Sequence, residues 1–241
     1  MYISIKNRII FLLIVFTLLP FVLLRIVAYP RIQSDLQEVL IRNLDGIGHK
    51  QAELVTTWAQ ERMKNARVIA NNPLMVKCAK IIKEDKDYAD IVQYLEVVKD
   101  EYGYKGVLVS NDKGLVTVST AEEGVGNDIS QMDYFNQALQ GSTFVSNVFP
   151  SEIPLTNEMG EKELGMPTMF VSTPLKDRDG VIIGVVAIRV DEKTLNDLML
   201  SLHLGKTGET YLINKDGYMI TESRFAAHLK EMGLVKKRCA L

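Results

Sequence analysis

The chain carries one short pattern twice, about 100 residues apart. Residues 106–118 read GVLVSNDKGLVTV, and residues 209–221 read ETYLINKDGYMIT. Both contain an Asn-x-x-Gly sequence, and Asn111 aligns with Asn214 at an offset of 103. Each copy predicts a strand, a turn and a second strand, because apolar residues flank residue types that tolerate left-handed backbone. A period this long exceeds that of a solenoid repeat, so it predicts two similar units in tandem.

The two copies differ in the length of chain that follows them. About 90 residues separate the first copy from the second, whereas the second is followed only by residues 222–241. We therefore expect a full first unit over residues 103–203 and a truncated second unit over residues 204–241. On this reading the sequence is a fragment of a longer protein.

An apolar segment near the N-terminus is long enough to cross a membrane. Ile9 to Leu24 contains no charged residue, but a helix of that length spans only about 24 Å of the ~30 Å hydrocarbon core. Residues 9–29 suffice if Arg25 reaches the interface with its long side chain. We expect a transmembrane helix at 9–29 and a cytoplasmic tail at 1–8.

The same segment could be a cleaved signal peptide, with Lys6 and Arg8 as its basic region. Two features favour an uncleaved anchor. The apolar run is long, and cleavage after Ala28 would place Ile26 where a small residue is required. Basic residues flank the run on both sides, so local charge does not decide its orientation.

Composition excludes several classes of function. A net charge of −2 without a basic stripe argues against a nucleic-acid partner. The chain has no GxxxxGK[ST], HExxH or GxSxG motif and no paired acid–base constellation, so no catalytic residues are expected in it. No cofactor or metal is expected, because the cysteines and histidines have no ligand spacing. They are Cys78, Cys239, His49, His203 and His228.

Helical spacing dominates residues 30–102. Apolar residues recur at helical intervals over 33–70, and Pro73 marks a break. A second helical stretch follows over 74–101, with an interruption near 83–87. The first of these helices is a plausible dimer element despite an imperfect heptad pattern, and a homodimer is expected to form through it.

After Gly103 the apolar period changes to two, which predicts an antiparallel sheet. Asp179-Gly180 predicts a hairpin turn, and a short helix over 128–139 is expected to be capped by Asp128 or Ser130. Residues 150–166 predict a long loop, and a further helix is expected at 192–202. The expected strands are 105–110, 114–119, 143–149, 167–175 and 181–190.

Three segments resemble the double Cache sensor region of bacterial transmembrane receptors. Residues 128–141, DISQMDYFNQALQG, look like the family's Asp-Ile-Ser-x-Arg-x-Tyr-Phe segment. Residues 173–191 resemble its pocket-lining hairpin, and residues 205–221 resemble the start of its membrane-proximal unit. The resemblance implies an α+β fold: a transmembrane helix, a long α-helix, a PAS-like antiparallel sheet as the membrane-distal Cache unit, and the start of a second, truncated Cache unit.

The family's distal unit binds a small molecule between the Tyr-Phe helix, the loop after it and the central strands. Two departures stand out in this sequence. Met132 replaces the arginine that often holds a ligand carboxylate, and Arg189 stands where amino-acid-binding members carry an aspartate. The α-amino-acid pattern is therefore not met.

Arg189 suggests an anionic ligand, because a guanidinium is a planar, permanently charged fork that suits a carboxylate or phosphate. The alternative is an arginine that faces solvent or pairs with Asp191 or Glu192. Phe135 is expected in the core. The Tyr134 hydroxyl would add one polar group to an otherwise apolar pocket. The complete set of candidate ligand-binding residues is Arg189, Tyr134, Met132, Phe149, Tyr104, Ser119 and Asp191.

These expectations describe the extracytoplasmic sensing region of a bacterial inner-membrane receptor with a small-molecule ligand. A sensor histidine kinase is the leading expectation for the output. A chemotaxis receptor or a diguanylate cyclase is the nearest alternative, since the resembled region serves all three. A membrane-anchored periplasmic binding protein without output is a further alternative. A membrane-tethered enzyme is disfavoured by the missing catalytic motifs.

Overall fold

The structure is a computed structural model that describes residues 5–156, 160–201, 208–214, 217 and 219–233. The chain divides into two compact units, Met1–Glu53 and Leu54–Leu241. The first unit is helical, and the second contains the sheet.

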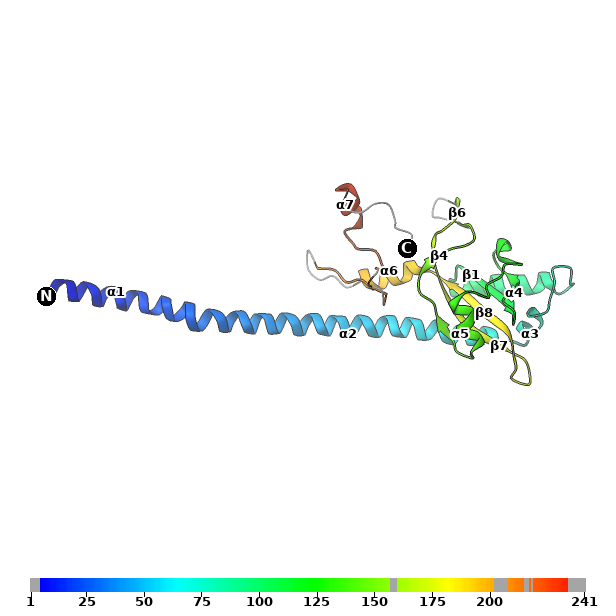
Figure 1. Cartoon of the computed structure of the whole chain (residues 1–241), viewed down its shortest axis with the longest axis horizontal. Coiled ribbons are helices and arrows are strands. Elements are labelled where there is room, and N and C mark those ends of the chain that lie inside the picture. The colour runs from blue at the N-terminus through cyan, green and yellow to red at the C-terminus, as the bar shows by residue number, and fades with distance from the viewer. Residues whose placement is uncertain (1–4, 157–159, 202–207, 215–216, 218, 234–241) are drawn as a thin grey trace. The chain divides into compact units, whose positions relative to one another are not determined.

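The described part of the first unit is continuous helix (Figure 1). Helix α1 (Ile5–Leu23) passes through a π-helical turn, Leu24–Ala28, into α2 (Tyr29–Ala70). The side chains of α1 are exposed, and from Ile9 onward all but Thr17 are apolar. The described residues contain one helix long and apolar enough to cross a membrane. A buried core helix can have the same composition, but it would not be exposed along its length.

The helical start of the second unit agrees with the expected break points. Helix α3 (Pro73–Cys78) follows a turn in which Asn72 accepts a hydrogen bond from the Leu74 amide at 3.0 Å. Proline at the first helical position loses no hydrogen bond there. Helix α4 (Tyr88–Tyr102) ends at Gly103 in left-handed backbone. The predicted interruption between the two helices is confirmed.

An antiparallel sheet follows in the order β2-β1-β8-β7-β3, with β4 pairing on β7. Strand β8 is central, because it pairs with both β1 and β7. The predicted α+β fold with a PAS-like sheet is confirmed. The strands are β1 (Gly106–Asn111), β2 (Val116–Ser119), β3 (Phe144–Val145), β4 (Phe149–Pro150), β7 (Pro167–Lys176) and β8 (Ile182–Val190).

The two faces of the sheet belong to different cores. Because side chains alternate along a strand, Val186 and Ile188 of β8 join the larger cluster, which includes residues of α2, α3 and α4. Val185 and Ala187 point the other way, into a smaller cluster beneath α5 (Asp133–Leu139). Figure 1 shows α5 lying against β7 and β8. The smaller core is therefore the one that contains the predicted Tyr-Phe helix.

Two local expectations, the cap of α5 and the loop at 150–166, are wrong. Neither Asp128 nor Ser130 caps α5, which begins after Met132 without a side-chain cap. Asp128 instead accepts a hydrogen bond from the Ser130 amide at 2.8 Å, forming a turn before the helix. The expected loop at 150–166 also contains a two-stranded hairpin of β5 (Leu155–Thr156) and β6 (Lys162–Glu163).

The expected strand at 143–149 is divided into β3 and β4 by Ser146. Its amide donates to the Phe170 carbonyl at 2.8 Å, as in a normal ladder. The Phe170 amide, however, donates to the Ser146 hydroxyl at 2.9 Å instead of to a backbone carbonyl. A side chain that replaces a ladder acceptor lets the backbone leave the sheet. The chain pairs again with β7 only at Phe149.

After β8 the chain enters α6 (Glu192–Leu200), which is capped by Asp191. In the second copy of the repeated pattern, the described residues contain the hydrogen bond expected of the turn. The Gly217 amide donates to the Asn214 carbonyl at 3.0 Å, and Gly217 has a φ of 87°. A β-bridge joins Ile213 to Met219, and the chain continues to α7 (Ala226–Glu231). Of the predicted second unit, residues 204–207, 215–216, 218 and 234–241 lie outside the described residues.

Candidate functional site

Helix α5 is held on the sheet by apolar packing and one buried hydrogen bond. The Ser172 hydroxyl of β7 donates to the Tyr134 carbonyl at 2.6 Å. Below the helix, β8 presents the small side chains Val185 and Ala187, so α5 can approach the sheet closely. The predicted Tyr-Phe helix is therefore fixed over the central strands β7 and β8.

Three aromatic rings stack beside this helix. The Tyr134 ring lies 4.7 Å from the Phe170 ring and 6.1 Å from the Phe149 ring, measured between centroids. Phe149 and Phe170 are 6.0 Å apart. The cluster joins α5, β4 and β7, and Met132 packs against the same core. Of the predicted site residues, Tyr134, Phe149 and Met132 are thus brought together.

Tyr134 is buried, and it remains a neutral phenol. Burial raises the pKa of Tyr134, and the negative charge of Glu152 adds to the shift. The ring is 3% exposed, so apolar packing accounts for most of its surface. The residue provides an aromatic wall with a neutral polar group.

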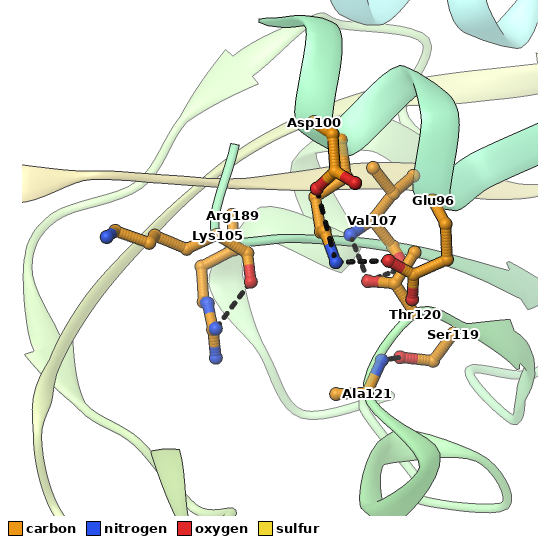
Figure 2. Close-up of polar contacts among 9 residues, drawn as sticks. Glu96, Asp100, Lys105, Val107, Ser119, Thr120, Ala121 and Arg189 are labelled. Carbon is orange, nitrogen blue, oxygen red and sulfur yellow. Dashed lines mark hydrogen bonds and ion pairs between the residues drawn. The ribbon is translucent and has the colours of Figure 1, made fainter. Parts of the chain in front are cut away.

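Arg189 lies at the end of β8, on the same face as Ala187. Its backbone pairs with Gly106 on β1 and with Phe170 on β7. Its side chain is half-buried and donates from Nη2 to the Lys105 carbonyl at 2.5 Å, as Figure 2 shows. The guanidinium is therefore held over β1, at the edge of the apolar cluster rather than inside it.

Lys105 and Asp191 complete the charged end of the sheet. The Lys105 Nζ atom lies 3.1 Å from an Asp191 carboxylate oxygen. The other oxygen of Asp191 accepts a hydrogen bond from the Lys193 amide at 3.1 Å and caps α6. Asp191 is thus both an ion-pair partner and a helix cap, and a direct ligand contact is not required to explain it.

Tyr104 and Ser119 lie apart from this group. Tyr104 belongs to the larger core on the opposite face of the sheet, where Asn65 of α2 donates to its hydroxyl at 2.9 Å. Ser119 is on β2, and its hydroxyl accepts from the Ala121 amide at 3.0 Å, away from Arg189 in Figure 2. The fold does not bring these two residues together with Tyr134.

A cleft of about 890 Å³ opens at the charged end of the sheet. Arg189, Lys105 and Asp191 line it on one side, together with the buried Thr168 of β7. The hairpin of β5 and β6, helix α6 and residues 222–227 form its other walls. An opening of this size is in the usual range for small-molecule sites.

Sequence reasoning missed Thr168 and Phe170. Both stand on the strand expected at 167–175, where a period of two places them on one face with Ser172. This alternation could have identified them as neighbours of Ala187 and Arg189. The predicted Asp179-Gly180 turn implies the register that pairs Phe170 with Arg189. What the sequence did not show is that α6 and residues after Glu222 line a cleft together with Thr168.

Metal or thiol chemistry has no support in the described part of the chain. Its His, Cys, Asp and Glu residues form no cluster of three or more that could hold a metal. Cys78 is a buried free thiol, and burial raises its pKa to about 12. A thiol in that state is not an effective nucleophile near neutral pH.

Comparison with known families identifies the fold. The Cache domain family matches residues 32–237, which is most of the chain. The chain belongs to the Cache domain family. Its sheet order and the helix over the central strands are thus those of a Cache sensor domain. No curated protein matches this Cache chain.

Solved structures agree on the fold of this Cache domain. The sensory domain of the Campylobacter jejuni chemoreceptor Tlp3 with isoleucine bound has a TM-score of 0.58 at 17% identity, covering 78% of this chain and 72% of its own. The ligand-binding domain of the Pseudomonas aeruginosa amino acid chemoreceptor PctC with GABA has a TM-score of 0.53 at 21% identity, covering 83% and 80%. The sensor domain of the V. cholerae histidine kinase DctB has a TM-score of 0.50 at 14% identity, covering 67% and 59%.

Proposed function

We propose that this Cache chain is the extracytoplasmic sensing region of a bacterial transmembrane receptor and binds a small anionic molecule. The observation that carries the ligand class is Arg189, which places a permanent positive charge at the wall of a cleft at the end of the sheet. Similar folds belong to sensor domains of chemoreceptors and of a histidine kinase. None of these relatives determines the ligand, since each is less than 25% identical.

The anion would lie in the cleft at the end of the sheet, beside the Arg189 guanidinium. A guanidinium has five N–H donors in a rigid fork, and the Arg189 Nη2 atom donates to the Lys105 carbonyl. A bidentate carboxylate or phosphate contact suits this group because the fork is rigid. The stacked rings of Tyr134, Phe149 and Phe170 belong to the core beside α5 and do not line this cleft. Tyr104 is not part of this proposed site.

The ligand class is tested by a thermal-shift screen of carboxylates, phosphate and amines on the full chain in detergent. Arg189→Ala removes the charged contact, so affinity for a stabilising carboxylate should fall about ten- to a hundredfold. Arg178→Ala is the matched control, because Arg178 is an exposed arginine in the β7–β8 turn. Stabilisation by amines alone, or an Arg189→Ala variant that binds like the parent, would refute the anionic ligand.

We place residues 1–8 in the cytoplasm and residues 32–241 outside it, in an inner-membrane protein. The exposed apolar surface of α1 supports a membrane span, because such a surface is unfavourable in water. Reporter fusions at residue 241 test this arrangement. A periplasm-dependent reporter should be active there. An active cytoplasmic reporter would reverse the orientation.

For the output we propose a sensor histidine kinase, with a chemotaxis receptor as the alternative favoured by the match to chemoreceptor domains. A diguanylate cyclase and an anchored binding protein without output are the remaining candidates. The coding sequence after residue 241 distinguishes these classes: a histidine kinase core supports the first, and a methyl-accepting signalling region supports the second.

We propose that two copies pair through the N-terminal half of α2. Apolar side chains are exposed there at intervals of four residues, at Leu36, Leu40 and Leu44. Such a stripe on one helix face favours a partner helix. A Leu40→Cys variant should form a disulfide-linked dimer under mild oxidation, whereas an Arg42→Cys variant on the charged face should not. Equal crosslinking of both variants would argue against this interface.

A further inference from the structure

Two serine or threonine hydroxyls are buried without a hydrogen-bond partner among the described residues. They are the Ser110 Oγ atom and the Thr168 Oγ1 atom. Ser110 is 0% exposed and Thr168 is 2% exposed. A buried hydroxyl that makes no hydrogen bond destabilises a fold, whereas an apolar group of the same shape does not. Each such group in a native protein therefore requires an explanation.

The two hydroxyls differ in their surroundings. Ser110 is in the middle of the sheet, opposite Val116 on one side and Val185 on the other. Thr168 is near the start of β7 and lines the cleft that Arg189 also lines. The Ser110 site is closed by strands, whereas the Thr168 site borders a space that a ligand can enter.

The strand register separates Thr168 from the Arg189 guanidinium by the width of β8. Phe170 pairs with Arg189, and Thr168 is two residues before Phe170 on the same face of β7. The Arg189 side chain extends in the other direction, across Gly106 on β1, to the Lys105 carbonyl. The guanidinium and the hydroxyl are therefore two separate polar points along one cleft.

We propose that Thr168 Oγ1 is a specificity-determining contact for a small carboxylate that carries a second, uncharged hydrogen-bonding group. This inference rests on the proposed function: the carboxylate binds Arg189, and the second group binds Thr168. Rotation about the Thr168 Cα–Cβ bond exchanges its methyl and hydroxyl positions between staggered states, so the hydroxyl can turn toward a ligand. A threonine hydroxyl both donates and accepts, which suits a ligand hydroxyl.

The second group is uncharged because Thr168 offers no counter-charge. A second carboxylate or an ammonium would gain no ion pair from Thr168 itself, and the cleft presents charges of both signs to it, for example Lys193 and Asp197. A hydroxyl loses less hydration and regains a hydrogen bond. The site should therefore prefer a hydroxy acid to the corresponding dicarboxylate or amino acid.

The test uses isothermal titration of the full chain in detergent with butyrate, 4-hydroxybutyrate, succinate and 4-aminobutyrate. These probes share a carboxylate and differ at the far end. The parent should bind 4-hydroxybutyrate more tightly than the other three. In Thr168→Val the affinity for 4-hydroxybutyrate should fall about tenfold, because one hydrogen bond is lost and a ligand hydroxyl is left unpaired. Butyrate affinity should stay unchanged, and Thr168→Ser should restore the preference.

Ser110→Ala is the matched control, since it removes the other unpaired hydroxyl far from the cleft. It should leave the binding of all four probes unchanged. Without ligand, Thr168→Val should melt at the parent's temperature or above it, because valine replaces an unpaired hydroxyl with an apolar group of the same shape. A melting temperature several degrees below the parent's would mean that the hydroxyl has a partner, such as an ordered water, and would overturn the inference.

The outcomes separate this inference from the proposed function. If a carboxylate binds, Arg189→Ala abolishes the binding and Thr168→Val does not alter the preference, the anionic site stands and the role of Thr168 is wrong. A parent preference for succinate or 4-aminobutyrate contradicts the uncharged second group. If none of the four probes binds the parent, the role proposed for Thr168 fails, while the anionic-ligand proposal is decided separately by the thermal-shift screen of carboxylates, phosphate and amines.

Discussion

The two copies of the strand–turn–strand pattern share one backbone hydrogen bond but lie in different surroundings. In each copy the glycine amide donates to the asparagine carbonyl, at 3.2 Å for Gly114 and 3.0 Å for Gly217. Both glycines have a φ of 87°. The first turn joins β1 and β2 of the central sheet, whereas the described residues of the second copy form a β-bridge and no named strand.

The difference lies in the neighbours of each copy. Strand β1 is paired on both sides, by β2 and by β8. The turn is supported further by residues 128–130: the Ile129 amide donates to the Gly114 carbonyl at 2.8 Å, and Leu115 bridges to Asp128. A local sequence is thus sufficient for the turn, but an extended ladder requires partner strands. Isolated two-stranded hairpins are marginal in water for the same reason.

The largest expected difference between the copies is the response to alanine at the turn glycine. A Cβ atom at Gly114 would lie 2.6 Å from the Ser130 backbone nitrogen, whereas at Gly217 nothing lies within 4 Å. Left-handed backbone costs a non-glycine residue about 1–2 kcal/mol, and overpacking adds about 1–3 kcal/mol. Gly114→Ala should therefore lower the free energy of unfolding by about 2–5 kcal/mol, as measured by urea denaturation.

Gly217→Ala carries only the backbone term, so its cost should not exceed about 2 kcal/mol. Gly180→Ala, in the β7–β8 turn, is a useful reference because it has a φ of 82° and also has nothing within 4 Å. Equal losses for Gly114→Ala and Gly217→Ala would mean that the contact with residue 130 does not distinguish the copies.

Hydrogen exchange compares the local stability of the two copies without a mutation. The second copy retains the Ile220 amide bond to the Leu212 carbonyl and the Leu212 amide bond to the Thr221 hydroxyl. The amides of β1 that bond to β8 lie in the middle of the sheet. Because exchange from a central strand requires more extensive opening, amides 212 and 220 should exchange at least about a hundredfold faster. Similar protection in both copies would show that the second copy is part of an equally stable sheet.

A smaller effect is expected from removal of the Glu209 carboxylate, which binds the residues that follow the second copy. Glu209 accepts hydrogen bonds from the Ser223 hydroxyl at 2.6 Å and from the Arg224 amide at 3.1 Å. Glu209→Ala should accelerate exchange of the Arg224 amide about tenfold and leave β1 unchanged, since bonds to a charged group contribute ~1.5–3 kcal/mol. Glu231→Ala, at an exposed acid of α7, is the control. An Arg224 amide that exchanges at the parental rate would remove Glu209 from this role.

The smallest expected effect is a pH dependence in the first copy. The hydrogen bond from the Ser130 amide lowers the pKa of Asp128. A carboxyl whose pKa is lower in the folded state stabilises the fold above its unfolded pKa of ~3.9, and this contribution is lost as pH falls through the folded pKa. The melting temperature of the parent should thus exceed that of Asp128→Asn slightly at pH 6, and the gap should close toward pH 3. A gap that is independent of pH would contradict this origin.

Some parts of the candidate site could be predicted from short sequence motifs. The Tyr-Phe helix, the pairing strands and the position of Arg189 beside Ala187 follow from periodicity and from the resemblance to the family. The separation of Tyr104 did not follow, because its face depends on where the chain enters β1. The hairpin inside the loop at 150–166 and the break at Ser146 were also missed, since both depend on hydrogen bonds to distant residues.

The sequence by itself determined the helices, the two Asn-x-x-Gly turns and the alternation along each strand, because these depend on backbone preferences and on residues a few positions apart. Only the tertiary structure decided which strands from distant parts of the chain become neighbours. The pairing of Gly106 with Arg189 places β1 beside β8, although the two residues are 83 positions apart in sequence. Register is set by the packing of whole faces against helices, and that information is spread over the entire domain.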